Sequence, residues 1–514
     1  MARRLSAVRT GLAALVVTMS VAAIGDATSS GATAPSPSPM PSQGGVQGPT
    51  LPANDLTAML SLTASQLAKE LPVTTPPGPT LRALAPPSCG AGSHPLAGMD
   101  GRVTAANIAS PGGAAGWTCN LSVVSSFTSP GGFRVWRYAD RSGHTCAFYD
   151  TSFTAPLTLV SVAGGPSLGV EVLDVSRRAH PVATATLTSL AMLAPHESLN
   201  LNAGRGLLVA EVGNGLTLPG TMDVYSVGQG CRHPRLLAEV PIATGHESGF
   251  SPDGRTFWVA GGAGYVYAFD LTNPSKPREL WKGAYYSHGL SLSPDGRTLY
   301  QTDPINGNLA IIDVSQVQDR AAHPVVKEIS RITWPTVSVP QNTKYFTSRG
   351  HKYLLEFDEF AFRFNPVTVK NTPGAVRIIN IDDPAKPRII SDIRLAVQMP
   401  AAHALAANDP NPLGPSAVLG YGSHYCAMPT AVNPQIIACS ELNSGLRVFN
   451  IANPAKPREV AYFISPPRKG GMLGAMQGDV AFSMPTFDVA RHDVWYTDAA
   501  SGFYALHLSK QAWH

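Results

Sequence analysis

Five histidines stand at the same place in successive copies of a repeated pattern in this 514-residue chain. They are His144, His196, His246, His288 and His424. Glu197 and Glu247 directly follow two of them, and the copy that has Trp334 at this place also contains "LLEFDEF", with Asp358 and Glu359. Several imidazoles with carboxylates nearby are a ligand set for a divalent or copper ion. The pattern therefore predicts a metal site with the five histidines as ligands.

The acidic and aromatic residues of the pattern have predicted roles beside the metal. Asp358 and Glu359 are the candidate catalytic acid and base, whereas Glu197, Glu247 and Trp334 are candidates for binding a small-molecule ligand. These residue types suit a metal-dependent lyase or oxidoreductase. The chain has no GxSxG elbow, P-loop or Rossmann fingerprint. Local chelating spacings such as HExxH are absent too, so the metal prediction depends on the register of the repeat alone.

A second hypothesis for the same histidines needs no ion. An imidazole that faces the axis of a ring can hydrogen-bond the backbone of the neighbouring unit and lock the ring. The protein would then be a non-catalytic scaffold of the cell envelope that binds an envelope protein through its loops. Asp358 and Glu359 would lie in a solvated loop. The sequence leaves both hypotheses open.

Two recurring phrases indicate the elements that must position these residues. "LTNPSKPREL" (271–280), "IDDPAKPRII" (381–390) and "IANPAKPREV" (451–460) each follow a strand-like run. Asn or Asp followed by Pro favours a tight turn, and the second Pro opens a strand that must lie at a sheet edge. "SPDGRT" (251–256 and 293–298) is an Asp-Gly hairpin between two further strands. Each unit is thus four antiparallel strands in about 42–60 residues, the period of a β-propeller blade.

Counting the units predicts an all-β, seven-bladed β-propeller of four-stranded antiparallel blades. The predicted first strands start at His144, His196, His246, His288, Trp334, His424 and near Ser483, with an insertion within about 341–423. Because first strands line the central channel of a propeller, the histidines should converge there. The last unit ends after three strands, and "CNLSVVSSF" (119–127) is expected to supply the fourth. Closure by this N-terminal strand would remove the open sheet edge.

The repeated strand–turn–"NPxKP"–strand phrase resembles that of the LVIVD-repeat propellers, which are secreted or surface proteins of bacteria. The "SPDGRTLY" hairpin (293–300) is similar to those of YVTN-type seven-bladed propellers. The resemblance covers about residues 119–509 and implies the fold and an extracytoplasmic location, without an activity. Lyases and thiol oxidases of this architecture use channel histidines, but none of their full motifs is present in this sequence.

The N-terminal region is predicted to direct the propeller out of the cytoplasm. Residues 1–34 combine an arginine-containing start with an apolar run (11–25) and read as a signal peptide. Residues 35–117 are expected to form a Pro/Ser-rich tether with one short helix (54–71) and coil, and residues 118–514 the propeller. Removal of the signal lowers the formal net charge from +4 to +2. This nearly neutral charge excludes a nucleic-acid partner. No later apolar run is long enough to span a membrane. We expect the protein to be a monomer.

Six cysteines are compatible with disulfides in an exported protein. Cys426 and Cys439 lie in two adjacent strands of one predicted hairpin, so they are predicted to be joined. The other four allow three pairings, among which the sequence does not choose: Cys89, Cys119, Cys146 and Cys231.

Overall fold

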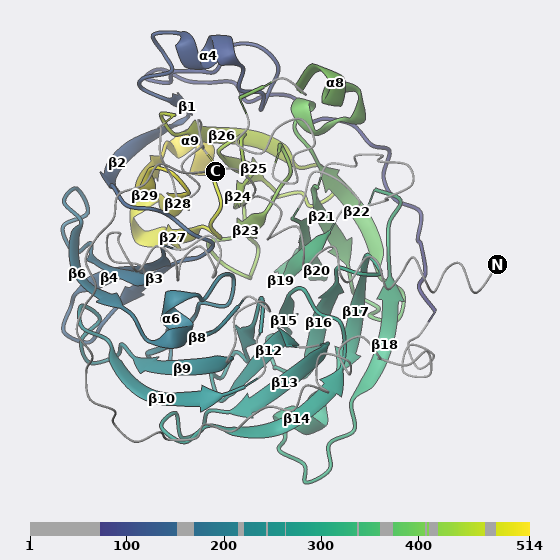
Figure 1. The fold of residues 1–514 in the computed structure, drawn as a ribbon. Helices are drawn as coiled ribbons and strands as arrows, with labels where there is room; N and C mark the ends of the chain where they lie inside the picture. The colour runs from purple at the N-terminus through teal and green to yellow at the C-terminus, as the bar shows by residue number, and fades with distance from the viewer. Residues whose placement is uncertain are drawn as a thin grey trace, which may run out of the picture. The chain divides into compact units, whose positions relative to one another are not determined.

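Seven antiparallel sheets follow one another around a ring, which confirms the predicted seven-bladed β-propeller (Figure 1). The structure is a computed structural model that describes residues 72–513 except 152–168, 214–219, 243–244, 263, 337–338, 360–373, 407–408, 411–419 and 468–479. The predicted signal peptide and the predicted helix 54–71 lie outside the described residues. Residues Leu71–His514 form one unit, and the first strands of neighbouring blades adjoin at its centre.

The first four blades are built from consecutive strands, which run in chain order from the innermost to the outermost. Blade 1 is β3 (Val135–Ala139), β4 (Thr145–Asp150), β5 (Val170–Asp174) and β6 (Val182–Leu187). Blade 2 is β7 (Asn200–Asn202), β8 (Leu207–Glu211), β9 (Thr221–Ser226) and β10 (Arg235–Pro241). Blade 3 is β11 (Gly249–Phe250), β12 (Thr256–Gly262), β13 (Tyr265–Asp270) and β14 (Arg278–Ala284). Blade 4 is β15 (Leu290–Leu292), β16 (Thr298–Asp303), β17 (Asn308–Asp313) and β18 (Lys327–Ile332).

The last three blades include the two N-terminal strands. Blade 5 is β19 (Pro340–Ser348), β20 (His351–Asp358), β21 (Val376–Asn380) and β22 (Arg388–Ile393). Blade 6 is β23 (Tyr425–Ala427), β24 (Ile436–Ser440), β25 (Leu446–Asn450) and β26 (Arg458–Ile464), with β1 (Trp117–Cys119) as a fifth strand. Blade 7 is β27 (Thr486–Asp488), β28 (Asp493–Asp498) and β29 (Gly502–Leu508), completed by β2 (Leu121–Phe127).

Helices are few and short in the described part of the chain. They are α4 (Ala105–Ala109), α6 (Leu190–Leu193), α7 (Ser315–Gln318), η2 (Ala396–Gln398), η3 (Pro400–Ala402), α8 (His403–Ala406), η4 (Val489–Arg491) and α9 (Lys510–Trp513). None of them has the length and hydropathy that crossing a bilayer requires.

The two recurring phrases form the predicted turns. In the first Asp-Gly hairpin, between β11 and β12, the Asp253 side chain accepts the N–H of Arg255, and Gly254 has φ +66°. In the Asn-Pro phrase between β13 and β14, Asn273 accepts the N–H of Ser275. The strands after this phrase lie at the blade edge in blades 3 and 5, as predicted, but in blade 6 the strand β1 covers β26. The edge prediction is wrong there because the N-terminal segment adds a strand.

The predicted closure of the ring by residues 119–127 is confirmed. Strand β2 pairs with β29 from Leu121 opposite Leu508 to Phe127 opposite Phe503. The last blade is therefore held by the two ends of the described chain, and β29 has no exposed edge. Cys119 belongs to β1, one residue before Asn120, which links the two N-terminal strands with a left-handed φ of 56°.

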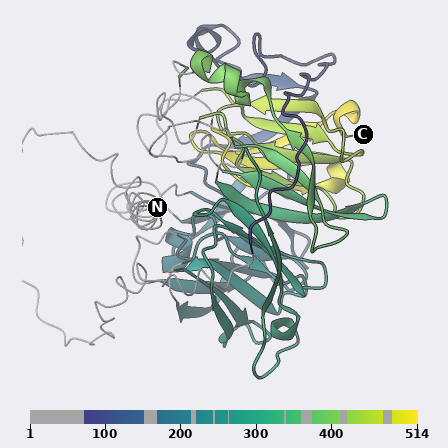
Figure 2. The same cartoon turned by 90° about the vertical axis from the view of Figure 1, so that its right-hand side faces the viewer.

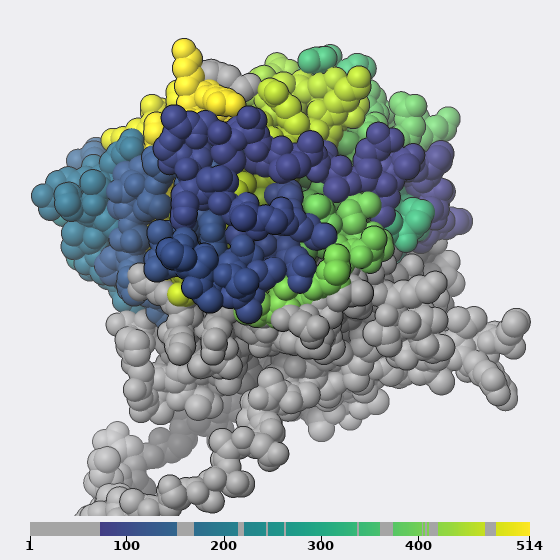
Figure 3. Space-filling view, turned by 90° about the horizontal axis from the view of Figure 1, so that it is seen from above, coloured from purple at the N-terminus to yellow at the C-terminus, as the bar shows by residue number. Residues whose placement is uncertain are grey.

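Residues 72–119, called the strap below, lie along the outer edges of blades 4, 5 and 6. The N–H groups of Thr74 and Leu84 donate to the carbonyls of Arg331 (3.0 Å) and Arg394 (2.9 Å). Further along, β1 pairs with β26. Figure 2 shows the strap crossing the green and teal strands, and Figure 3 shows it beside the yellow C-terminal residues. The strap, which belongs to the segment predicted to be a tether, thus contacts three blades of the propeller.

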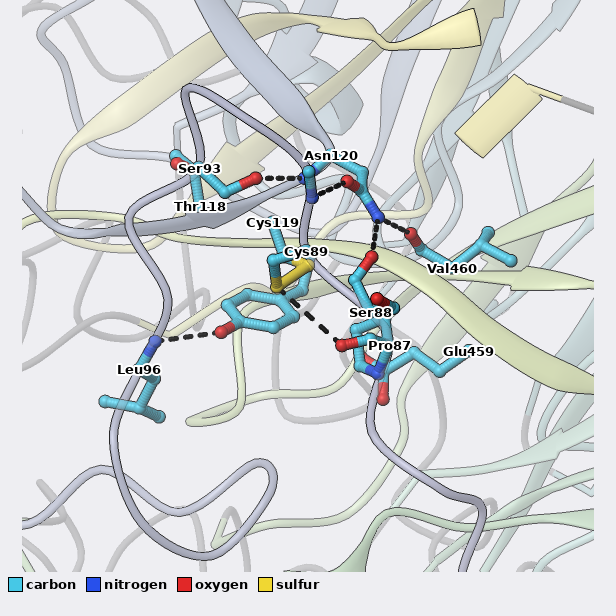
Figure 4. The surroundings of a disulfide bond; sticks show 12 residues. Pro87, Ser88, Cys89, Ser93, Leu96, Thr118, Cys119, Asn120, Glu459 and Val460 are labelled. Atoms are coloured by element: carbon cyan, nitrogen blue, oxygen red, sulfur yellow. Dashed lines mark hydrogen bonds between the residues drawn. A yellow bond between two sulfur atoms is a disulfide. The ribbon is translucent and has the colours of Figure 1, made fainter. Parts of the chain in front are cut away.

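Three disulfides join the six cysteines. The predicted pair Cys426–Cys439 is confirmed, and the other two pairs are Cys89–Cys119 and Cys146–Cys231. The Cys89–Cys119 disulfide joins two positions of the strap to each other (Figure 4). Beside it the Asn120 amide donates to the carbonyls of Ser88 (2.9 Å) and Val460 (2.8 Å), which fixes the strap to blade 6. Three disulfides indicate an oxidising compartment.

Two predicted blade starts are wrong. His144 precedes β4, the second strand of blade 1, because β3 comes before it. Trp334 follows β18, the outer strand of blade 4, where it is buried in an apolar cluster. Much of the interval 341–423 is blade 5 itself, which occupies residues up to Ile393. These errors share a cause, since neither blade 1 nor blade 5 carries a histidine at its start.

Glu171 on β5 gives the fold a predicted dependence on pH. Its side chain is buried, and this burial raises the pKa of Glu171 to about 7. The unfolded chain releases the proton near pH 4.5, so the folded state loses stability as pH rises from there to about 7. Glu171→Gln should therefore be more stable than the parent at pH 8, by about 1–3 kcal/mol, and equal to it at pH 4.5. Denaturant unfolding at both pH values measures this, and Glu279→Gln on the exposed side of β14 should show no such difference.

Candidate metal centre

Four of the five predicted histidines meet at the centre of the ring. His196, His246, His288 and His424 directly precede or lie close before the inner strands of blades 2, 3, 4 and 6. The ring centroids of His196 and His246 are 4.9 Å apart, and those of His246 and His288 are 4.8 Å apart. Repeats of the same phrase have thus placed side chains from distant segments side by side. These four histidines together with Glu197 and Glu359 are called the axial cluster below.

His144 lies elsewhere, in the turn between β3 and β4. Its Nδ1 is 3.5 Å from an Asp140 carboxylate oxygen, and the side chain is 32% exposed. Blade 1 instead approaches the axial cluster with the residues before β3, at the other end of that strand. Phe133 packs there on His196, with ring centroids 4.2 Å apart. The structure therefore does not bring His144 together with the other four histidines.

Glu197 is at the middle of the axial cluster and is fully buried. Its Oε2 lies 3.0 Å from Nε2 of His246 and 3.7 Å from Nε2 of His288. Its Oε1 lies 3.1 Å from Nε2 of His424. This carboxylate, predicted as a ligand-binding residue, thus faces imidazoles from three other blades.

Glu359 comes to the cluster from the end of blade 5, whereas its neighbour Asp358 does not. The Glu359 carboxylate is 3.1 Å from Nε2 of His288 and 3.9 Å from Nε2 of His424. The Asp358 carboxylate is 2.7 Å from Nη1 of Arg377. The same guanidinium lies over the Trp334 ring, 4.8 Å from the ring centroid. Of the two predicted catalytic carboxylates, only Glu359 contacts the axial cluster.

Backbone carbonyls fix the orientation of three of the imidazoles. Nδ1 of His246, His288 and His424 lies 2.9, 3.0 and 2.7 Å from the carbonyls of Gly213, Pro340 and Phe482. A carbonyl only accepts, so each Nδ1 carries a proton, and Nε2 is the ring nitrogen that faces the carboxylates. This is how metal-binding histidines are commonly held by their surroundings. Each of the three bonds also joins two neighbouring blades.

A second layer of polar residues supports the axial cluster. Gln341 Nε2 donates to Glu197 (2.7 Å), to Glu247 (3.0 Å) and to the Tyr425 hydroxyl (2.7 Å). The Glu247 carboxylate, predicted to bind a ligand, accepts from Arg134 and Asn342 instead. Glu247, just before β11 of blade 3, thereby contacts side chains of blades 1 and 5, which are not its neighbours in the ring. A Cβ at Gly289, the residue beside it, would lie 2.3 Å from the Gln341 carbonyl, so this close approach of the strands requires glycine.

Sequence reasoning missed several of these neighbours. Arg134 and Gln341 come from blades 1 and 5, which have no histidine phrase to mark the register. Tyr425 could have been found from the sequence, because it directly follows His424 in the same way that Glu197 directly follows His196. Phe133 and Phe482 stand edge-on to His424, with ring centroids 5.7 and 5.5 Å away, and form an apolar side of the cluster that no motif marks.

Charge is unevenly divided within the axial cluster. Burial alone would raise the pKa of Glu197, but the His246 and His424 imidazoles outweigh it and hold that pKa well below its usual range. In return Glu197, against the opposing effect of burial, raises the pKa of His246 to about 9. Burial and the His246 charge lower the pKa of His288 to about 4, while burial and Glu197 raise that of Glu359 to about 8. Near neutral pH the cluster therefore holds one ion pair and one neutral carboxyl group beside a neutral imidazole.

The donor set fits a late first-row transition metal. Two groups of three residues have ligand atoms that lie within 4.8 Å of one another, namely His196, Glu197 and His246, and Glu197, Glu359 and His424. Two atoms bound to one ion at about 2.0–2.2 Å are separated by about 3.0–3.4 Å. The distances of 3.0 and 3.1 Å from Glu197 to His246 and His424 match that separation. The His246 side chain is 27% exposed and gives the cluster contact with solvent.

Comparisons with known proteins identify no family for this chain. No family model and no curated protein matches the sequence, so the LVIVD-repeat resemblance stays a prediction. Similar solved structures include candidate 6-phosphogluconolactonases from Bacteroides uniformis (14% identity, TM-score 0.42, 66% of this chain and 92% of that chain) and Bacteroides fragilis (12%, 0.41, 68% and 94%). Another is the β-propeller domain of Cps50 (Swd1) from Myceliophteria thermophila (12%, 0.46, 75% and 98%).

Proposed function

We propose that the protein is an exported, monomeric β-propeller whose axial cluster binds a divalent or copper ion. The observation that carries the proposal is the orientation of His246, His288 and His424. Each has its Nδ1 fixed on a backbone carbonyl and its Nε2 directed at a buried carboxylate. Imidazole and carboxylate together suit zinc, copper, iron or nickel rather than calcium or magnesium.

We further propose a metal-dependent lyase or oxidoreductase that acts on a small molecule. A bound ion would supply a Lewis acid at the axis. Glu359 is the predicted catalytic carboxylate that lies at this site, 3.1 Å from Nε2 of His288, and it would serve there either as a metal ligand or as the acid or base. Asp358 is not part of this proposal, since its carboxylate is paired with Arg377. Phe133 and Phe482 offer an apolar side to a substrate.

The non-catalytic scaffold remains the second candidate, and the same Nδ1 bonds support it. They join blade 3 to blade 2, blade 4 to blade 5 and blade 6 to blade 7. In this case the imidazoles lock the ring, and the protein binds an envelope partner by its loops. The two candidates differ in metal content and in the effect of losing one histidine.

Elemental analysis of protein purified without chelator, beside thermal melts of His246→Ala, tests the proposal. Metal binding predicts about one or more ions per chain in the parent protein, with a reduced amount in the variant and a modest loss of stability. The scaffold predicts no metal and a loss of about 1–3 kcal/mol, because buried polar groups lose their partner. His144→Ala is the matched control and should change neither quantity. A folded parent protein without metal would contradict the metal function.

A further inference from the structure

We propose that the axial cluster holds two metal ions, with Glu197 as a carboxylate bridge between them. This rests on the proposed metal-binding function and concerns the number and placement of the ions. The two oxygens of Glu197 face different imidazoles. Oε2 lies 3.0 Å from Nε2 of His246, whereas Oε1 lies 3.1 Å from Nε2 of His424.

Two sets of three possible ligands meet at Glu197. The first set is His196, Glu197 and His246, from blades 2 and 3. The second set is Glu197, Glu359 and His424, to which blades 5 and 6 contribute. The sets share Glu197 alone, so each has two further donors of its own. His288 adds to the second set, because its Nε2 is 3.1 Å from the Glu359 carboxylate.

The surroundings keep the Glu197 carboxylate in this bridging orientation. Gln341 donates to its Oε2 at 2.7 Å, which restricts rotation of the carboxylate. His246 and His424 are in turn held by the carbonyls of Gly213 and Phe482, in blade 2 and on the way into blade 7. His246 lies at Oε2 of Glu197 and His424 at Oε1. Because both imidazoles are held in place, the Glu197 carboxylate cannot direct both of its oxygens to the same imidazole. A single ion would leave one of these imidazoles without a metal.

Two ions bridged in this way would lie about 3.5–4 Å apart, as in other two-metal sites. A small molecule between them would be held by both. Glu359, a ligand of the second ion only, gives a means to remove that ion selectively. His196 is a ligand of the first ion only, so substitution of His196 should remove the first ion selectively.

Metal stoichiometry after loading with Cu²⁺ and removal of excess ion tests the bridge. The parent protein should retain about two ions per chain, and Glu359→Gln and His196→Ala about one each. Electron paramagnetic resonance of the parent should show the coupled, weakened signal of a close copper pair, and Glu359→Gln the full signal of an isolated copper ion. His144→Ala, which changes a histidine outside the axial cluster, should retain two coupled ions.

The outcomes separate this inference from the function on which it rests. One retained ion with an uncoupled signal in the parent protein would overturn the bridge and leave the metal function standing. No retained ion would overturn both. If a variant does not fold, the number of Cu²⁺ ions retained by the parent protein and the coupling between them are sufficient to test the bridge.

Discussion

A chain that lacks residues 72–128 is expected not to form a stable propeller, even though it keeps every residue of the axial cluster. The deletion removes β2, and β29 then loses its partner along the ladder from Leu121–Leu508 to Phe127–Phe503. It also removes β1 and the Cys89–Cys119 disulfide. We expect a loss of stability well above the roughly 4 kcal/mol that marks an exceptional point mutation. Thermal melts followed by circular dichroism should show a lower, broader transition and aggregation through the open edge.

A matched deletion of residues 35–70 should leave the melt unchanged, because those residues lie outside the unit that contains the propeller. An intermediate deletion of residues 35–85 removes only the contacts of Thr74 and Leu84 and should cost little. Equal melts for all three truncated proteins would contradict the role of β2 in closing the ring.

Arg377→Met should be among the most destabilising single substitutions in the chain, at about 3–5 kcal/mol. The Arg377 guanidinium is fully buried and lies 3.1 Å from Glu356, 2.7 Å from Asp358 and 3.4 Å from Asp392. Removing it leaves buried carboxylates that repel one another. Burial and Asp358 already raise the pKa of Glu356 well above its usual range. Denaturant unfolding measures the effect.

Arg297→Met is the control for this substitution. Arg297 makes an equally short contact, 2.7 Å to Asp319, but the two side chains are 45% and 52% exposed. Solvent screens such a pair, so no measurable change in stability is expected. If Arg377→Met were as stable as this control, the buried ion pairs of Arg377 would not contribute to the stability of the fold.

The propeller could be predicted because its blades repeat short turns with a definite geometry. Asp-Gly and Asn-Pro turns specify a hairpin within a few residues, and their spacing gives the strand count. The convergence of His196, His246, His288 and His424 followed from the same register. The prediction failed for His144, where "DRSGHT" (140–145) forms a Gly-containing turn like those elsewhere, but between the first and second strands.

The support of the axial cluster and the path of the strap could not be predicted. Gln341 and Arg134 act through single side-chain contacts across blades, and such contacts leave no periodic pattern in a sequence. The strap is held by isolated hydrogen bonds, a three-residue strand and a disulfide, so its contacts repeat at no fixed interval. The pairing of Cys89 with Cys119 depends on that path, which is why three alternatives remained open.

The pairing of β2 with β29 has a consequence for how the molecule is made. Leu121 emerges from the ribosome long before its partner Leu508, because almost the whole propeller lies between them in the sequence. Blade 7 therefore cannot form until β29 has been synthesised, and until then β2 either stays unpaired or pairs wrongly. Closing so long a loop is entropically costly and slow. A nascent chain stalled before β29 should thus be sensitive to proteases and dependent on chaperones, although six of its blades have been synthesised.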